Sequence, residues 1–128
     1  MKLKNRDIVS FINGCAALKE KKLPIKIGYA INRNIIALTE AAEAYNMARE
    51  KIIKEYAEKD SKGELVIRDD CYVFKDKQAF NKDLEELLDI DTEVNLHTIS
   101  ENDIEKCDDF RYDALTLADL DTLCIMIK

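Results

Sequence analysis

The sequence predicts an α+β fold in which a long N-terminal αα-hairpin precedes a small antiparallel β-sheet and short C-terminal helices. The only proline, Pro24, is followed by a stretch, residues 25–59, in which Gly28 is the sole helix breaker. Two short β-prone segments, residues 64–68 and 71–75, come next and are joined by two aspartates. Helical spacing of apolar residues then returns in the last third of the chain.

The first helix is expected over residues 6–20, with Asn5 as its N-cap. Apolar residues recur there at intervals of three and four: Ile8, Phe11, Ile12, Cys15 and Leu18. A polar turn over residues 19–23 leads into Pro24, whose fixed φ suits the start of a helix. Helix, short turn and longer helix form an αα-hairpin.

The second helix is too long for a compact domain of this size. Over residues 25–59 it would measure roughly 50 Å at 1.5 Å per residue, whereas a compact chain of this length is about 35 Å across. The helix must therefore project, bend or be covered by a second copy of the chain.

One face of this helix carries a coiled-coil-like series, which we call the seam. Its spacing alternates between four and three residues: Ile31, Ile35, Leu38, Ala42, Tyr45, Arg49, Ile52 and Tyr56. The first helix is half as long and can cover only half of the seam. The sequence therefore predicts an interaction face, used for self-association as a homodimer or for a partner: Ile31, Ile35, Leu38, Tyr45, Arg49, Ile52 and Tyr56. We expect Arg49 to reach water along its aliphatic stem.

The second half of the chain shows turn and capping signals. Residues 59–63 end the long helix, with Gly63 suited to a left-handed turn, and residues 64–75 read as a β-hairpin. Asp76 is placed to cap a helix over residues 77–88. Further strands are expected at residues 92–99 and 2–4, and capping boxes at Ser100 and Thr116 start two short helices.

Composition indicates one domain, residues 1–128, with a helical part (1–60) and a part built of sheet and helices (61–128). The chain is 47% apolar, contains no tryptophan and has no apolar run of about 20 residues, so we expect no membrane span and a cytoplasmic location in a host cell. Its cysteines lie far apart in the sequence: Cys15, Cys71, Cys107 and Cys124. We expect reduced, mostly buried thiols and no metal site.

The net charge of −6 conceals a division along the chain. Residues 1–60 hold 12 basic and 8 acidic residues, whereas residues 61–128 hold 8 and 18. This asymmetry could steer a partner, or it could let the two halves attract each other within one fold or across a dimer. We favour the attraction between the halves.

The order of these features resembles a family of uncharacterised proteins from phages and prophages of Gram-positive bacteria. Several segments carry the resemblance: Met1-Lys2-Leu3-Lys4-Asn5, Lys22-Leu23-Pro24-Ile25-Lys26 with Tyr29-Ala30-Ile31, Lys54-Glu55-Tyr56-Ala57-Glu58-Lys59-Asp60, Phe80-Asn81-Lys82 with Leu84-Glu85-Glu86-Leu87-Leu88, and Ala118-Asp119-Leu120 with Ile125-Met126-Ile127. The resemblance implies a viral setting and one compact unit. It transfers no functional residues.

No catalytic, cofactor-binding or metal-ligating residue is predicted. Three glycines leave no phosphate-binding loop, and no zinc or nucleophile motif is present. His97, the only histidine, reads as an ordinary surface or half-buried side chain, and the acidic groups lack the spacing of an EF-hand loop. Nucleic-acid binding is disfavoured by a pI near 4.9 and by the absence of aromatic residues within the basic segment 19–26.

The sequence thus predicts a non-enzymatic phage protein that acts through protein–protein interaction or assembly, using its long helix. One alternative is an acidic inhibitor that imitates nucleic acid, since residues 61–128 hold 18 carboxylates. A second alternative is a small enzyme whose site is assembled from dispersed residues. Such a site would bring His97, a cysteine and several carboxylates into one pocket.

Overall fold

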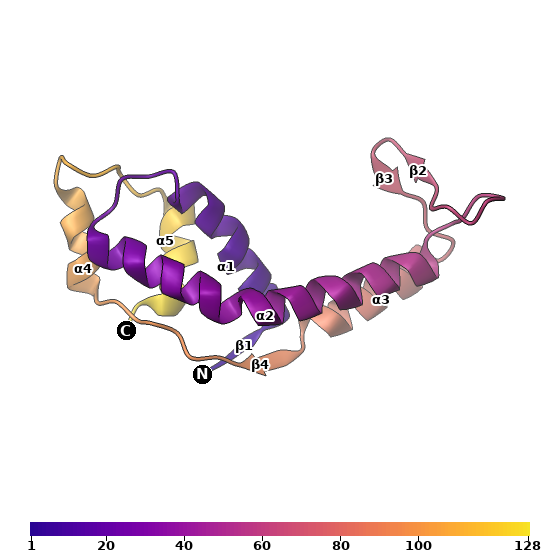
Figure 1. The fold of residues 1–128 in the computed structure, drawn as a ribbon, viewed down its shortest axis with the longest axis horizontal. Helices are drawn as coiled ribbons and strands as arrows, with labels where there is room; N and C mark the ends of the chain where they lie inside the picture. The colour runs from indigo at the N-terminus through magenta and orange to yellow at the C-terminus, as the bar shows by residue number, and fades with distance from the viewer.

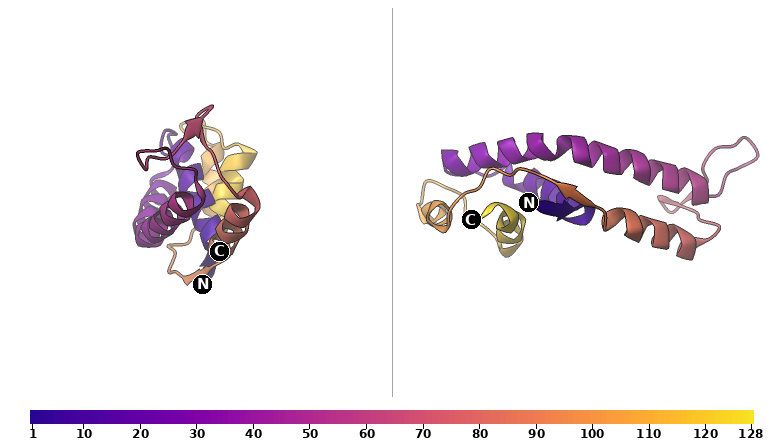
Figure 2. Two further views of the ribbon diagram at one scale, coloured as in Figure 1. Left: turned by 90° about the vertical axis from the view of Figure 1, so that its right-hand side faces the viewer. Right: turned by 90° about the horizontal axis from the view of Figure 1, so that it is seen from below.

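The long helix α2 (Ile25–Tyr56) runs the length of the molecule and belongs to two parts of it (Figure 1). The computed structural model describes residues 1–128 and has the α+β fold that the sequence predicts. At about 1.5 Å per residue, the 32 residues of α2 span about 48 Å. The prediction that this helix exceeds a compact domain is confirmed, because its second half projects from the rest (Figures 1 and 2).

The first part, which we call the body, surrounds the first half of α2. It contains α1 (Asn5–Leu18), α4 (Glu101–Glu105), α5 (Leu117–Leu123) and 3₁₀ turns at Lys106–Asp108 and Cys124–Met126. α1 lies beside α2 after the turn at residues 19–24, so the predicted αα-hairpin is confirmed. The core of the body holds 14 buried residues, among them Phe11, Leu38 and Met126.

The second part, which we call the arm, is built on the second half of α2. α3 (Lys77–Leu88) returns alongside α2, and a hairpin of β2 (Ile67–Arg68) and β3 (Cys71–Tyr72) forms the tip (Figure 1). A small separate cluster of Ile53, Ala57 and Phe80 holds the arm together. The rings of Phe74 and Phe80 stack there with their centroids 4.0 Å apart.

The strands form two separate pairs rather than one sheet. β1 (Lys2–Lys4) pairs antiparallel with β4 (Asp91–Glu93) in the body, with Leu3 opposite Thr92. The expected strand at residues 92–99 ends at Glu93. Beyond the strand, Asn34 of α2, which is fully buried, holds the extended chain: its side-chain amide accepts from His97 N at 2.6 Å and donates to His97 O at 2.9 Å.

Local capping signals predicted several helix starts correctly. Asp76 accepts from the Ala79 amide at 3.0 Å, and Ser100 and Thr116 form the expected capping boxes. Asn5 does not act as the expected N-cap. It is the first residue of α1, it is 6% exposed, and its Nδ2 donates to the carbonyl of Leu87 at 2.8 Å.

The long helix ends at Tyr56, earlier than expected. Ala57 is extended and pairs with Phe74, and Lys59 pairs with Leu65, so residues 57–59 join the base of the hairpin instead of continuing the helix. Gly63 has the predicted left-handed conformation, with φ 82°. None of the helices is both long enough and apolar enough to cross a membrane.

Candidate protein interaction groove

Most of the seam on α2, the predicted interaction face, packs against other parts of the same chain. Ile31, Leu38 and Tyr45 are 3%, 0% and 8% exposed. Ile35 packs against the body core, and Ile52 and Tyr56 pack against the arm cluster. Ile31, Leu38 and Tyr45 are therefore out of reach of a second molecule, whereas Ile35, Ile52 and Tyr56 stay half-buried.

The cover over the second half of the seam is α3. The chain reverses direction at the tip, so the apolar face of α3 returns onto α2 and meets the residues that α1 is too short to reach. The Tyr56 hydroxyl donates to Asp83 Oδ2 at 2.6 Å, and this bond raises the pKa of Tyr56 to about 12. Arg49 is exposed and forms no ion pair, as expected for a side chain that reaches water.

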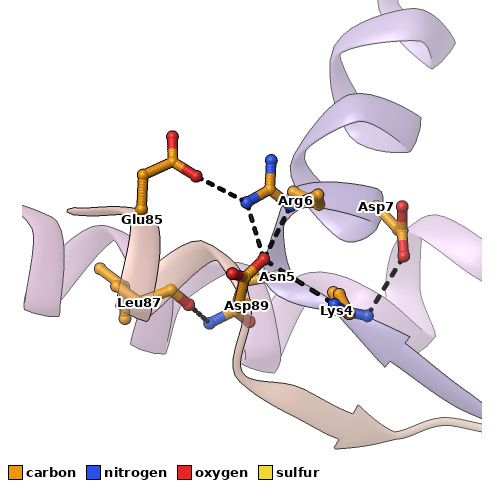
Figure 3. A network of polar contacts seen from close by, with 7 residues as sticks. All are labelled: Lys4, Asn5, Arg6, Asp7, Glu85, Leu87 and Asp89. Atoms are coloured by element: carbon orange, nitrogen blue, oxygen red, sulfur yellow. Dashed lines mark hydrogen bonds and ion pairs between the residues drawn. The ribbon is translucent and has the colours of Figure 1, made fainter. Parts of the chain in front are cut away.

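A polar network fastens the arm to the body where α1 begins and α3 ends (Figure 3). Arg6 Nη2 lies 2.8 Å from Glu85 Oε2 and 2.7 Å from Asp89 Oδ1. Hydrogen bonds to Glu85 and Asp89 raise the pKa of Arg6, and the hydrogen bond from Arg6 lowers the pKa of Asp89. Asn5 adds its bond to Leu87, so two neighbouring residues of α1 hold the end of α3.

Further ion pairs join the basic first half of the chain to the acidic second half. Lys21 Nζ lies 2.6 Å from Asp119 Oδ2, and Lys26 Nζ lies 3.4 Å from Asp103 Oδ1. Burial opposes ionisation of Asp119, but hydrogen bonds from Lys21 and Thr116 outweigh it and the pKa of Asp119 is lowered. Attraction between the halves is therefore realised inside one molecule, as we favoured.

These contacts bear on the idea of nucleic-acid mimicry. Glu85, Asp89, Asp103 and Asp119 each face a cationic side chain of the first half at 3.9 Å or less, so they do not present free charge to a partner. Mimicry stays a prediction, and it would have to use the remaining carboxylates.

The most prominent concave feature is a groove between α2 and β4, at the junction of body and arm. Its volume is about 610 Å³, larger than the next cavity at about 390 Å³. α2 contributes one wall, β4 and the residue after it the other, and the end of α3 closes one side; the lining residues are Asn5, Ala37, Glu40, Ala41, Ala44, Tyr45, Leu87, Ile90, Thr92, Glu93, Val94 and Asn95. Of the predicted interaction face, only Tyr45 borders it.

The sequence fixes the two walls in different ways. Ala37, Ala41 and Ala44 fall at i, i+4 and i+7, so they lie on one side of α2 and leave space where larger residues would pack. The Arg6 and Asn5 contacts hold the other wall at its distance, because they fix the turn between α3 and β4. The alanine spacing was visible in the sequence, but the pairing of β1 with β4 joins residues some 90 positions apart and has no local signal.

The residues considered for chemistry do not meet. His97 is exposed and packs edge-on against the Tyr29 ring at 5.5 Å, outside the groove. Cys15 and Cys107 are buried, and Cys71 and Cys124 are exposed; burial raises the pKa of Cys15 to about 11. No group of three histidine, cysteine, aspartate or glutamate side chains has the geometry to hold a metal ion. The groove gathers neither His97 nor a cysteine.

Comparison with known proteins assigns no function to the groove. No family model, curated protein or solved structure matches this chain.

Proposed function

We propose that this chain is a non-enzymatic phage protein of the host cytoplasm that acts by binding another protein through the groove between α2 and β4. The observation that carries the proposal is the groove itself, an open cavity of about 610 Å³ between a helix and a strand in a molecule whose seam is already covered. Open concave surfaces with apolar linings are the usual sites of recognition.

The composition of the lining favours binding of a polypeptide over catalysis. Seven of its 12 residues are hydrophobic, and the groups able to ionise are two carboxylates and Tyr45. One carboxylate, Glu93, pairs with the Met1 amino group at 2.9 Å. The two carboxylates stand on opposite walls, Glu40 on α2 and Glu93 on β4, and no histidine, cysteine, lysine or arginine joins them in the lining.

Self-association stays part of the proposal only through surfaces other than the seam. The covered residues would have to leave the core before a second copy could reach them, and uncovering large apolar side chains costs about 1.5–3 kcal/mol each. The partner we propose at the groove is therefore a different protein.

A photoreactive amino acid tests the proposal in cells that produce the protein. Placed at Ala44, which is exposed and lines the groove, it should give a covalent adduct with another protein on illumination. Ala16 of α1 is the matched control, because it is also an exposed helical alanine but lies outside the groove.

Adducts at Ala44 but not at Ala16 would support the groove as the binding surface. Equal adducts at both positions, or none at either, would contradict it. A sedimentation measurement on the purified chain adds the oligomeric state, since a mass of 14.7 kDa excludes a stable homodimer under those conditions.

A further inference from the structure

β4 has one edge that no strand covers. In an antiparallel pair, alternate residues exchange backbone hydrogen bonds and the others turn theirs outward. The Asn5 amide bonds to Ile90 O and the Val94 amide bonds to Met1 O, with Leu3 opposite Thr92 between them. The amide and carbonyl of Glu93 therefore point away from β1, and the Asn95 amide forms no hydrogen bond at all.

The groove runs along this uncovered edge. Successive residues of a strand point to opposite faces, so a cavity over one face would be bordered by alternate residues only. Four consecutive residues, Thr92 to Asn95, border the groove. Consecutive residues of both faces are expected to border a cavity that lies along the strand edge, where the free amide and carbonyl groups are.

The opposite wall leaves room for one more strand. Ala37, Ala41 and Ala44 present single methyl groups to the cavity, and Ala44 is exposed. Thr92 to Asn95 extend over about 14 Å at 3.4 Å per residue, which is the length of a four-residue strand. An added strand would satisfy the free backbone groups of Glu93 and Asn95 and pack its side chains on these alanines.

The charge of the walls selects the composition of that strand. Glu40 on α2 and Glu93 on β4 are the charged residues of the lining, and no lysine or arginine borders the groove. The lysines of β1 lie on the other side of β4, where Lys2 is opposite Glu93 and Lys4 faces Asp89. Because Glu93 already pairs with the Met1 amino group, Glu40 is the carboxylate that a lysine or arginine of the segment would meet, and an acidic segment would be repelled by it.

The same charges argue against a second copy of β4 as the occupant. Antiparallel pairing of two β4 strands about their centre, Thr92, would place Asp91 opposite Glu93, and like charges directly opposite destabilise a strand pair.

We propose that the groove binds an extended segment of a partner protein, rich in β-branched apolar residues and carrying lysine or arginine, which adds to the free edge of β4 as a third strand. This inference rests on the proposed function and names the partner's chemistry and its mode of binding. Affinity then comes from backbone hydrogen bonds, and specificity from the alanine wall and Glu40.

A displayed library of random heptapeptides, selected on the full chain, provides the probe. Selected peptides should alternate Val, Ile or Thr with Lys or Arg. A synthetic copy of the strongest binder is then methylated at one backbone nitrogen at a time. Methylation of alternate nitrogens should weaken binding about 5- to 10-fold by removing one inter-strand bond, and methylation of the intervening ones should not.

Variants of the protein complete the test. Ala44→Trp should abolish binding by filling the groove, Ala16→Trp should leave it unchanged, and Glu40→Lys should weaken the basic peptides most. Failure to select any peptide, selection of acidic or helical peptides, or equal effects of all N-methyl positions would overturn strand addition. A cellular adduct at Ala44 together with any of these results would leave the proposed function standing and reject this inference alone.

Discussion

Gly14 lies where α1 crosses α5, and it leaves no room for a side chain. A Cβ at this position would collide with the Oγ1 and Cγ2 atoms of Thr122. Gly28, in the first turns of α2, has nothing within 4 Å of the same atom. Two glycines in helices thus have opposite roles, one required by close packing and the other merely tolerated.

Alanine at these two positions should have effects of opposite sign. Gly14→Ala should destabilise the protein by about 1–3 kcal/mol, because α1 and α5 must move apart. Gly28→Ala should stabilise it by about 0.4–1 kcal/mol, because alanine restricts the unfolded chain and fits the helix. Urea unfolding followed by circular dichroism measures both, and a stabilising Gly14→Ala would show that the helices do not cross this closely.

Among the elements, α3 is the one that covers the second half of the seam on α2. Its apolar residues were evident in the sequence, as was the seam on α2 that lacked a cover, but nothing local stated that one covers the other. The link is the tip, where Asp69 and Asp70 adopt φ of 51° and 62° and turn the chain back. Both central residues of a tight hairpin turn of this type have positive φ, a conformation that aspartate adopts more readily than most residues.

This difference explains what could be predicted. Helix starts at Asp76, Ser100 and Thr116 depend on residues three positions apart, so the sequence displays them. Asn5 also has the side chain of a typical N-cap, but it donates a hydrogen bond to the carbonyl of Leu87, which is distant in sequence, and does not cap the helix. The groove could not be predicted from the sequence. Its walls are two segments about 50 residues apart, and the distance between them in the fold depends on the contacts of Arg6.

The arm should be able to loosen without the body. Phe80→Ala removes the ring that stacks on Phe74 and clusters with Ile53 of α2 and Ala57 at its end, a loss of about 3–5 kcal/mol in the arm cluster. Hydrogen exchange followed by mass spectrometry should then accelerate in α3 and in the second half of α2, while α1 and α5 keep their protection.

Leu38→Ala is the comparison, since Leu38 is fully buried in the body core. It should accelerate exchange in α1 and α5 as well. If Phe80→Ala accelerates exchange equally throughout the chain, body and arm unfold as one unit.

At the scale of the whole molecule, the hydrogen bonds and ion pairs of three aspartates make the stability of the fold depend on pH: Asp89 accepts from Arg6, Asp103 from Ser100, and Asp119 from Lys21 and Thr116. The folded state lowers the pKa of Asp89, Asp103 and Asp119 from 3.8, so the stability they contribute is present above about pH 4 and is lost as the pH falls through their folded pKa values. The urea midpoint should fall between pH 5 and pH 2.

Asp119→Asn should make this fall smaller, because an amide cannot ionise and loses its attraction to Lys21 at every pH. Glu43→Gln, a change at an exposed glutamate outside these ion pairs, should leave the pH dependence unchanged. Identical pH dependence in the wild type and Asp119→Asn would show that this carboxylate has the same pKa folded and unfolded.

The pairing of β1 with β4, and of α1 with α5, also sets the order in which a newly made chain can fold. Arm contacts join residues 52–84, whereas the body core joins Leu3 and Ile8 to Leu123 and Met126. On the ribosome, synthesised from the N-terminus, the arm can form while the body core still lacks its last members. During that interval the apolar residues of α1 that α5 covers remain exposed and available to chaperones, so we expect the completion of α5, rather than the growth of α2, to limit the folding of the body.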